Sequence, residues 1–385
     1  MVSQLHSNGS VEEEDSNDQT YSISDLTIGT KDQKLNFEKY LNPIILPNQN
    51  HNQSYFKNLK NLKNKHEYIF VINWVYQFRA FLKPLGSESF DVDLFELELL
   101  NYFPDLNSKV LFINKLKLSI LKFLEPTTKY ELDDFEKIVY LWFRNLTPIS
   151  FEEEYNDENM EEEEEIKEEG DEIKEEKLEI QQEDQQDFNP KNLPKFDYLL
   201  IEDKFKTLYV IINYISKNHK FRSWISNQSN NLPDFSRIDP IYSNIITKNN
   251  APAREEYYLL FDNQRLYKRT IKYNEIKVPK TLKSSPQDPN EYYKPEQFDI
   301  SQQNIKFELL YNNIFEFNEY LTKIKNNKAL KPIYMKLYKS QIIENFFENE
   351  IKKRKFLISK KKEIQLANLL AVRKRSLRLR EKEKT

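Results

Sequence analysis

The residue types that most often carry catalysis or hold metals are scarce in this chain of 385 residues. There is no Cys, which excludes disulfides and cysteine-ligated zinc. The four His (His6, His51, His66 and His219) have neither HxxxH nor HExxH spacing. The four Gly are dispersed, so neither a phosphate-binding loop nor a dinucleotide fingerprint can form. The sequence therefore predicts no metal, no cofactor, no small-molecule substrate and no enzymatic activity.

Charged side chains are the chemistry that the chain does offer, and they are segregated by sign. The net charge of −4 conceals an acidic run, Glu152–Asp187, with 20 acids against 3 Lys, and a basic tail from Ile351 with 14 Lys and Arg against 3 acids. Segregated charge of this kind indicates an interaction protein, with a basic arm for polyanions and an acidic spacer.

The basic tail predicts contacts with DNA phosphates. Each Lys or Arg that reaches a phosphate releases counterions, which gives sequence-independent and salt-sensitive binding. The candidate contacts in the tail are Lys352, Lys353, Arg354, Lys355, Lys360, Lys361, Lys362, Arg373, Lys374, Arg375, Arg378 and Arg380. Arg265, Lys268 and Arg269 on a predicted hairpin are further candidates. A nuclear localisation signal alone, or a merely solvated helix, would also account for the tail.

The acidic run cannot bury a core, because few apolar residues interrupt it. A plain linker is the simpler interpretation, and an acidic patch that faces histones is the more specific one. The polar first 30 residues lack the apolar segment of a signal peptide, and Tyr68–Phe78 is too short to span a bilayer. The sequence thus predicts a soluble, intracellular protein without a membrane partner.

Helical periodicity dominates residues 66–147. Four helices separated by prolines are predicted, the second opening at Asp91, and they suggest a compact bundle. Its predicted core comprises Trp74, Phe78, Phe95, Leu99, Leu116, Ile120 and Trp142. These side chains should be buried together.

The second half of the chain predicts helices around a small β-hairpin. Helical periodicity runs through 196–225, and Glu256–Phe261 and Arg265–Arg269 flank a turn at Asp262. A stripe of apolar residues then predicts a helix with an ordinary core face, or with a short coiled coil. The stripe consists of Phe307, Leu310, Ile314, Phe317, Leu321 and Ile324. A long helix should follow Pro332 into the basic tail.

These elements predict a mainly α-helical protein in five parts. A disordered tail (1–35) precedes a helical bundle (36–150) and a disordered acidic linker (151–190), which should separate two independently folded pieces. A second, mostly helical region with the hairpin (191–345) leads to a basic C-terminal helix or tail (346–385).

Three segments of the bundle resemble a DDT domain. Asn73–Phe78 is similar to the aromatic first helix of that domain, and Phe90–Leu100 to its second helix with the pattern "DLE…LL". Leu111–Leu121 is similar to its Leu-rich third helix. Phe196–Ile212 and the Arg265-Leu-Tyr hairpin are similar to the first and second WHIM motifs that accompany DDT domains, and 305–324 has the place of the third. A Gly-containing turn and a Trp, usual in the second motif, are missing here.

The resemblance implies an accessory subunit of an ISWI-type chromatin remodeller. Such a nuclear, non-catalytic protein would hold the remodeller's ATPase subunit, touch linker DNA, and so help to set nucleosome spacing or regulate transcription. The alternative is a histone-binding, chaperone-like adaptor that uses its acidic run.

Overall fold

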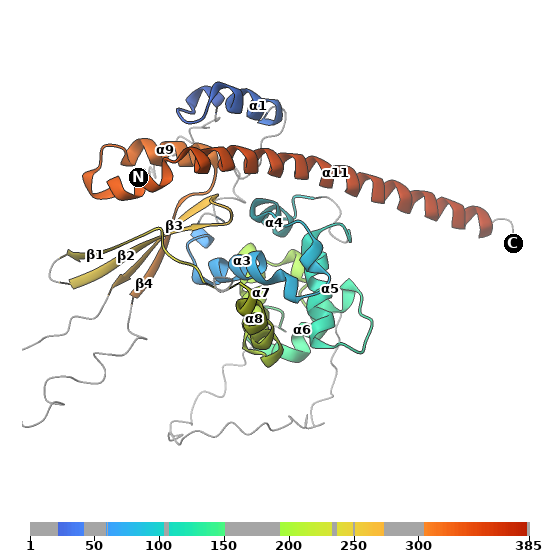
Figure 1. The fold of residues 1–385 in the computed structure, drawn as a ribbon. Coiled ribbons are helices and arrows are strands. Elements are labelled where there is room, and N and C mark those ends of the chain that lie inside the picture. Colours follow the sequence, from blue (N-terminus) through green and yellow to red (C-terminus); the bar gives the residue numbers. More distant parts are fainter. Residues whose placement is uncertain are drawn as a thin grey trace, which may run out of the picture.

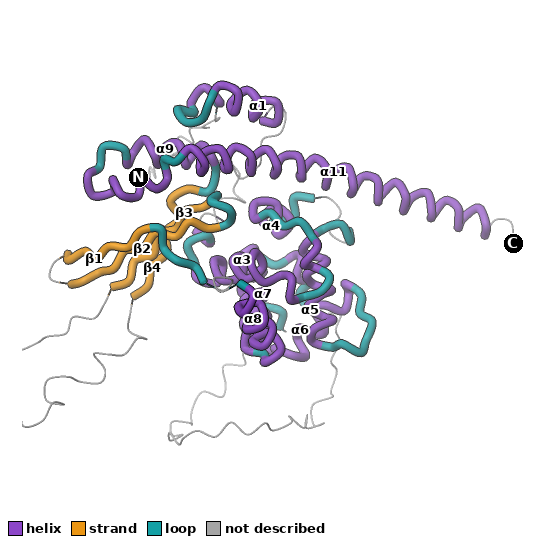
Figure 2. The backbone as a smooth tube through the Cα atoms, viewed as in Figure 1, coloured by secondary structure: helices purple, strands orange, loops and turns teal. Residues whose placement is uncertain are grey.

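A computed structural model gives the fold (Figure 1). Most of the described residues are helical, and one small sheet among them lies to one side of the helices (Figure 2). The acidic run and residues 1–21 lie outside the described part of the chain. The described residues are 22–41, 59, 61–103, 108–150, 193–232, 237–248, 251–272 and 304–382.

The four helices predicted for the bundle are present. They are α3 (His66–Phe78), α4 (Val92–Leu99), α5 (Phe112–Leu124) and α6 (Phe135–Phe143). Asp91 caps α4 as expected, because its carboxylate accepts a hydrogen bond of 3.0 Å from the Leu94 backbone N–H.

Five of the seven predicted core residues are buried: Trp74, Phe95, Leu99, Leu116 and Ile120. Phe78 is only partly buried, although it packs against the same core. The prediction for Trp142 was wrong, since this side chain is 41% exposed. Its indole N–H reaches Glu125 at 3.2 Å and its ring packs against Tyr214, so the polar edge faces outwards near the end of α6.

Two further helices, α7 (Ile201–Lys217) and α8 (His219–Asn231), complete the helical body. The Phe205 ring lies 4.8 Å from that of Tyr68, and the Phe221 ring lies 5.6 Å from that of Trp74. Residues on both sides of the acidic run thus share one hydrophobic core. The expectation of two independently folded pieces is therefore not met.

The predicted hairpin belongs to a larger sheet. β2 (Ala251–Leu260) and β3 (Arg265–Lys272) form it, and β1 (Tyr242–Lys248) and β4 (Asn304–Tyr311) flank it in the antiparallel order β1-β2-β3-β4. Tyr257 faces Lys268, and Arg269 faces Phe307. Phe307 and Leu310 were expected on a helix but lie on β4, because two apolar residues three positions apart are too few to distinguish a helix from a strand.

The rest of the chain builds a second core above the sheet. α9 (Ile314–Ile324), α10 (Lys331–Leu337) and α11 (Ser340–Lys382) pack there with α1 (Lys31–Leu41). The expected disordered tail is thus wrong for residues 22–35, because Leu26 and Ile28 are buried in this core. Gly29 has a φ of +83°, and a Cβ atom there would lie 2.4 Å from the Phe347 ring, so this approach of the chain to α11 requires glycine.

Helix α11 is the longest element, with 43 residues, which corresponds to about 65 Å. Its first half crosses the second core and then α4, and its last buried residue in the described chain is Ile364. The remainder projects beyond the body (Figure 1). Of the 14 Lys and Arg in the basic tail, six lie on this projecting part of α11, between Arg373 and Lys382.

Candidate nucleic-acid interface

The basic residues of α11 divide into a buried and an exposed set. Lys353, Arg354 and Lys360 are at most 4% exposed, as is Arg265 on β3. These four were candidate DNA contacts. Their charged groups are instead enclosed by the protein, so phosphates cannot reach them in this structure. The correction raises the question of what they bind.

Arg265 binds the carboxylates of α4. Its guanidinium donates to Asp93 Oδ1 at 2.5 Å and to Glu96 Oε1 at 2.8 Å, and it also contacts the hydroxyl of Tyr68. Lys63 reaches the other oxygen of Glu96 at 2.9 Å. Hydrogen-bonded charge pairs of this kind are required where charges are taken out of water.

Helix α11 supplies the remaining cations. Lys353 pairs with Asp93 and, at 2.9 Å, with Glu350, while Lys360 pairs with Glu98. Arg354 pairs with Glu350 on its own helix, and its guanidinium lies over the Phe37 ring. Asp93 and Glu98, two of the acids that alternate with apolar residues along α4, thus bind cations of α11.

The pKa values agree with this arrangement. Burial alone would raise the pKa of Asp93, but Lys353 and Arg265 outweigh it and hold the pKa below its ordinary value. For neighbouring Asp91, burial prevails over the attraction of Lys353 and raises the pKa to about 6.

Lys204 on α7 binds the C-terminal end of α4. Its ammonium group donates a hydrogen bond of 2.7 Å to the Leu99 carbonyl, so α7 satisfies that end of the helix. Burial lowers the pKa of Lys204 to about 8.

All eight residues of α4 are buried. Its carboxylates and its C-terminal carbonyl take cations from the segment before α3, from α7, from β3 and from α11. The sequence did not identify this ionic cluster (Lys63, Asp93, Glu96, Glu98, Lys204, Arg265, Glu350, Lys353, Arg354 and Lys360). It fixes α11 on the helical body, and so fixes the direction in which the end of α11 projects.

The exposed set remains available to a polyanion. Lys352, Lys355, Lys361, Lys362, Arg373 and Lys374 have exposed side chains. Arg375, Arg378 and Arg380 also lie on α11, although their side chains are not described. Lys352 lies 3.7 Å from Glu348, and both are largely exposed, so this pair contributes little. Among the described side chains, the helix therefore presents exposed cations from Lys352 to Lys374.

The hairpin candidates lie in a different setting. Lys268 pairs with Glu255 at 2.8 Å, and Arg269 pairs with Glu256 at 2.5 Å across the β2–β3 ladder. Their partial exposure leaves them accessible, but carboxylates on the same sheet face already neutralise them. These two residues stabilise the sheet.

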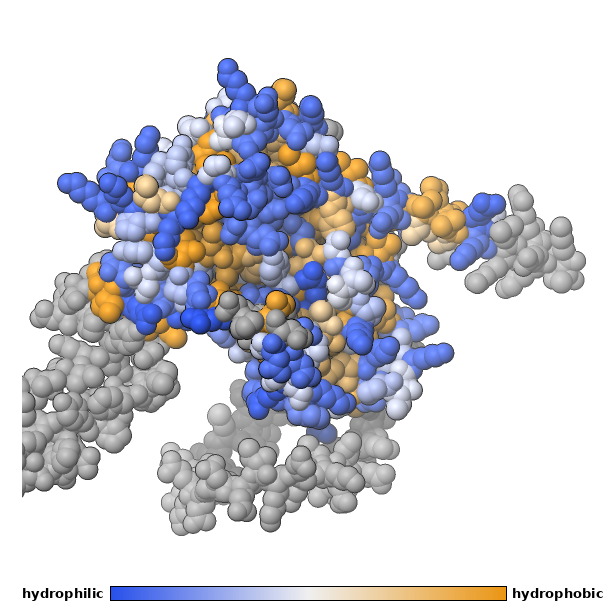
Figure 3. All heavy atoms as spheres, viewed as in Figure 1, coloured by the Kyte–Doolittle hydropathy of each residue, from blue (hydrophilic) through white to orange (hydrophobic). Residues whose placement is uncertain are grey.

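Apolar side chains accompany the cations on the projecting part of α11. Leu366, Leu369, Leu370 and Val372 are between 48% and 67% exposed. They form the hydrophobic patch on this part of the helix in Figure 3. The arm is thus both basic and apolar.

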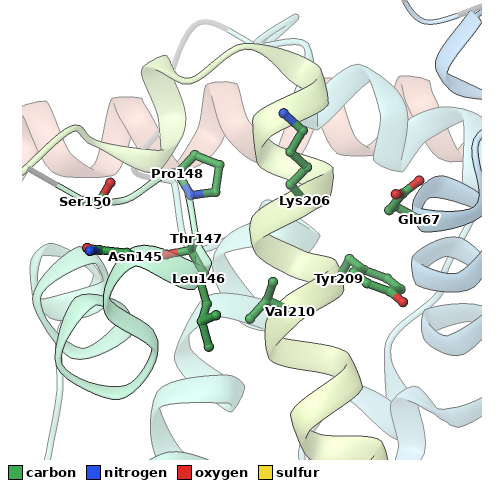
Figure 4. A pocket seen from close by; sticks show the side chains of 9 residues that line it. All are labelled: Glu67, Asn145, Leu146, Thr147, Pro148, Ser150, Lys206, Tyr209 and Val210. Atoms are coloured by element: carbon green, nitrogen blue, oxygen red, sulfur yellow. The ribbon is translucent and has the colours of Figure 1, made fainter. Parts of the chain in front are cut away.

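One cavity of about 460 Å³ lies between the end of α6 and α7 (Figure 4). Leu146, Pro148 and Val210 give it apolar walls, and Lys206 and Glu67 lie at its rim. The lining holds no nucleophile paired with a base. Among the described residues there is also no group of three side chains that could hold a metal. The cavity can accept an apolar side chain, but it has no catalytic constellation.

Comparison with known proteins finds a family model that matches part of the chain. Residues 66–235 match the protein-family model described as the ISWI one complex protein 2 N-terminal domain. This range begins with α3 and ends after α8, so it contains both halves of the shared core. No curated protein and no solved structure gives a significant match. No helix in the described ranges is long and apolar enough to cross a membrane. The family match supports an accessory subunit of an ISWI complex.

Proposed function

We propose that this chain is a non-catalytic nuclear subunit of an ISWI-type chromatin remodeller, and that it binds both the ATPase subunit and linker DNA. In this proposal the helices α3–α6 form a DDT-like domain, and α7, the hairpin and the following elements form a WHIM-like region. The family match over residues 66–235 supports the complex. The role is to help set nucleosome spacing.

The observation that carries the DNA-binding part is the projecting end of α11. Exposed Lys361, Lys362, Arg373 and Lys374 lie on a rigid helix whose base is held by buried ion pairs. Since no base-reading pattern is evident, the contacts should be to phosphates and tolerant of sequence. A fixed arm would hold the duplex at a defined position relative to the body, which spacing requires.

The arm is tested by replacing Arg373, Lys374, Arg375, Arg378 and Arg380 with Gln. Binding of the purified protein to duplex DNA should weaken for all sequences alike. If five phosphate contacts are lost, the slope of log K against log[salt] should flatten by about 4 to 5. Unchanged affinity and slope, with loss of nuclear import in cells, would make the tail a localisation signal only.

The ATPase partner is tested by tagging the chain and identifying co-purifying proteins by mass spectrometry. An ISWI-type ATPase should be recovered in nuclease-treated extract, because the expected contact is protein to protein. Recovery that disappears with nuclease treatment would show bridging by DNA, and would contradict a direct subunit contact.

A histone-binding adaptor is the alternative, and it rests on the 20 acids of Glu152–Asp187. Deleting 152–187 separates the two functions. Loss of histone binding with intact DNA binding would favour the adaptor. Unchanged binding of histones would exclude this use of the acidic run.

A further inference from the structure

A second group of cations lies at the other end of α11. Residues 322–341 contain six Lys and no Asp or Glu. Four of them form what we call the α9–α10 lysine surface: Lys323 and Lys325 at the end of α9, Lys328 in the connecting 3-10 turn, and Lys331 at the start of α10. All four are exposed. None of the four forms an ion pair with any described residue. Within residues 322–341 the cluster is therefore a run of positive charge without acids.

The fold does not account for this surface. Lys323 near the C-terminal end of α9 suits the helix dipole, which favours cations there. Lys331 opens α10, where the dipole disfavours a cation, and Lys328 lies one turn before it. Neighbouring like charges add repulsion. By contrast, the ammonium group of Lys336 on α10 donates a hydrogen bond to the Ile241 carbonyl, so this lysine connects α10 to the residue before β1.

The position of the surface separates it from the arm. The α9–α10 hairpin lies at the end of the molecule opposite to the C-terminal end of α11 (Figure 1). Hydrophilic side chains project from this end in Figure 3, among less polar ones. Ser340 to Arg373 on α11 corresponds to about 50 Å. The two basic surfaces therefore cannot contact the same few phosphates.

We infer that the α9–α10 lysine surface is a second binding surface for the phosphate backbone of duplex DNA. This inference goes beyond the proposed arm, and it can hold whether or not the arm binds DNA. Lysine ammonium groups suit phosphate contacts, which position a duplex without specifying its sequence. At about 3.4 Å for each base pair, the separation along α11 corresponds to roughly 15 base pairs. The chain would then hold DNA at two points a fixed distance apart.

The experiment uses the full chain and a 40-base-pair duplex labelled with a fluorophore. The surface variant carries Lys323→Gln, Lys325→Gln, Lys328→Gln and Lys331→Gln. A matched control carries the same change at four exposed lysines of the helical bundle: Lys109, Lys122, Lys129 and Lys137. The surface substitutions and the control substitutions are each also combined with the five Gln substitutions of the arm. Anisotropy titrations at several salt concentrations give affinity and salt slope, and thermal melting checks the fold.

Four lost phosphate contacts should flatten the salt slope by about 3 to 4 and weaken binding roughly tenfold or more at low salt. The control should keep the affinity of its parent. In the arm variant, the residual DNA binding should disappear when the surface is also changed. If the surface variant matches the control in both backgrounds, the inference is overturned, while the arm result still stands.

Other anionic partners are separated with two further probes. Vesicles containing anionic phospholipid test a membrane surface, which exposed Met335 and Tyr338 beside the lysines would also suit. A polyglutamate peptide tests an acidic polypeptide. If the surface variant loses binding to either probe and keeps wild-type DNA binding, the surface does not bind DNA.

Discussion

Burial distinguishes adjacent residues of the same charge on α11. Lys352 is exposed, whereas Lys353 beside it is buried against Asp93. An exposed ion pair contributes about 0–1 kcal/mol, whereas removing one partner of a buried pair costs about 3–5 kcal/mol, because the other charge is left uncompensated. Residues that sequence analysis treats as equivalent should therefore respond to mutation in different ways.

Arg265→Ala should destabilise the protein by about 3–5 kcal/mol, since it leaves Asp93 and Glu96 buried without their shared cation. Arg254→Ala is the control. Its side chain is 44% exposed and pairs with Glu256 on its own strand, so the cost should be about 1 kcal/mol or less. Urea unfolding monitored by circular dichroism measures both. Equal effects would show that the buried cluster does not hold α4.

Asp91→Asn should stabilise the protein at neutral pH. The pKa of Asp91 in the folded protein is about 6, above the value of about 3.9 expected in the unfolded chain. Above pH 6 the folded state must therefore keep an unfavourable carboxylate, a cost that fades as the pH falls towards 4. Asn keeps the helix cap without the charge.

The measurement is the difference in unfolding free energy between Asp91→Asn and wild type from pH 4 to 7.5. The advantage of the variant should be largest at pH 7.5. Asp93→Asn is the contrast. Its lowered pKa stabilises the wild type above the unfolded pKa, so this variant should be least favourable at neutral pH. A variant at position 91 that is most harmful at pH 7.5 would contradict the argument.

Helix positions could be predicted from the sequence better than helix faces. The periodicity located α3 to α6, and Asp91 and the Asp262 turn marked real element boundaries. The burial of the cations on α11 was missed, although a signal existed. Glu350, Lys353, Leu357, Lys360 and Ile364 recur every three or four residues, in line with the apolar positions before them. Charged side chains are usually exposed, and the α4 carboxylates that allow these cations to be buried lie 260 or more residues away in the sequence.

The two tryptophans of the bundle test the assignment of α6. Trp142→Ala should cost about 1 kcal/mol or less, because the side chain is 41% exposed at the end of the helix. Trp74→Ala should cost about 3–5 kcal/mol, because Trp74 on α3 is 3% exposed and packs on Phe221. Thermal melting of the full chain compares them. A larger loss at Trp142 would show that α6 packs through its other face.

At the scale of the whole molecule, one core joins segments from both sides of the acidic run. Cutting the chain within this run should therefore leave two associated fragments. A site for a specific protease placed after Gly170 allows a single cut without disturbing any described residue. After cleavage, the fragments should elute together in size-exclusion chromatography and melt in one transition close to that of the uncut protein.

The association should depend on the shared core and the ionic cluster. The fragments should separate in about 6 M urea, and a cleaved protein that also carries Arg265→Ala should dissociate at lower urea than the cleaved wild type, because β3 then loses its buried contact with α4. Residues 1–150 produced alone should be poorly folded, since α7 covers Tyr68 and satisfies the end of α4 through Lys204. If the two fragments separate in native buffer and each keeps a cooperative transition, the helical body consists of two domains. Helix α11 would then not be held rigidly enough to position DNA at two fixed points.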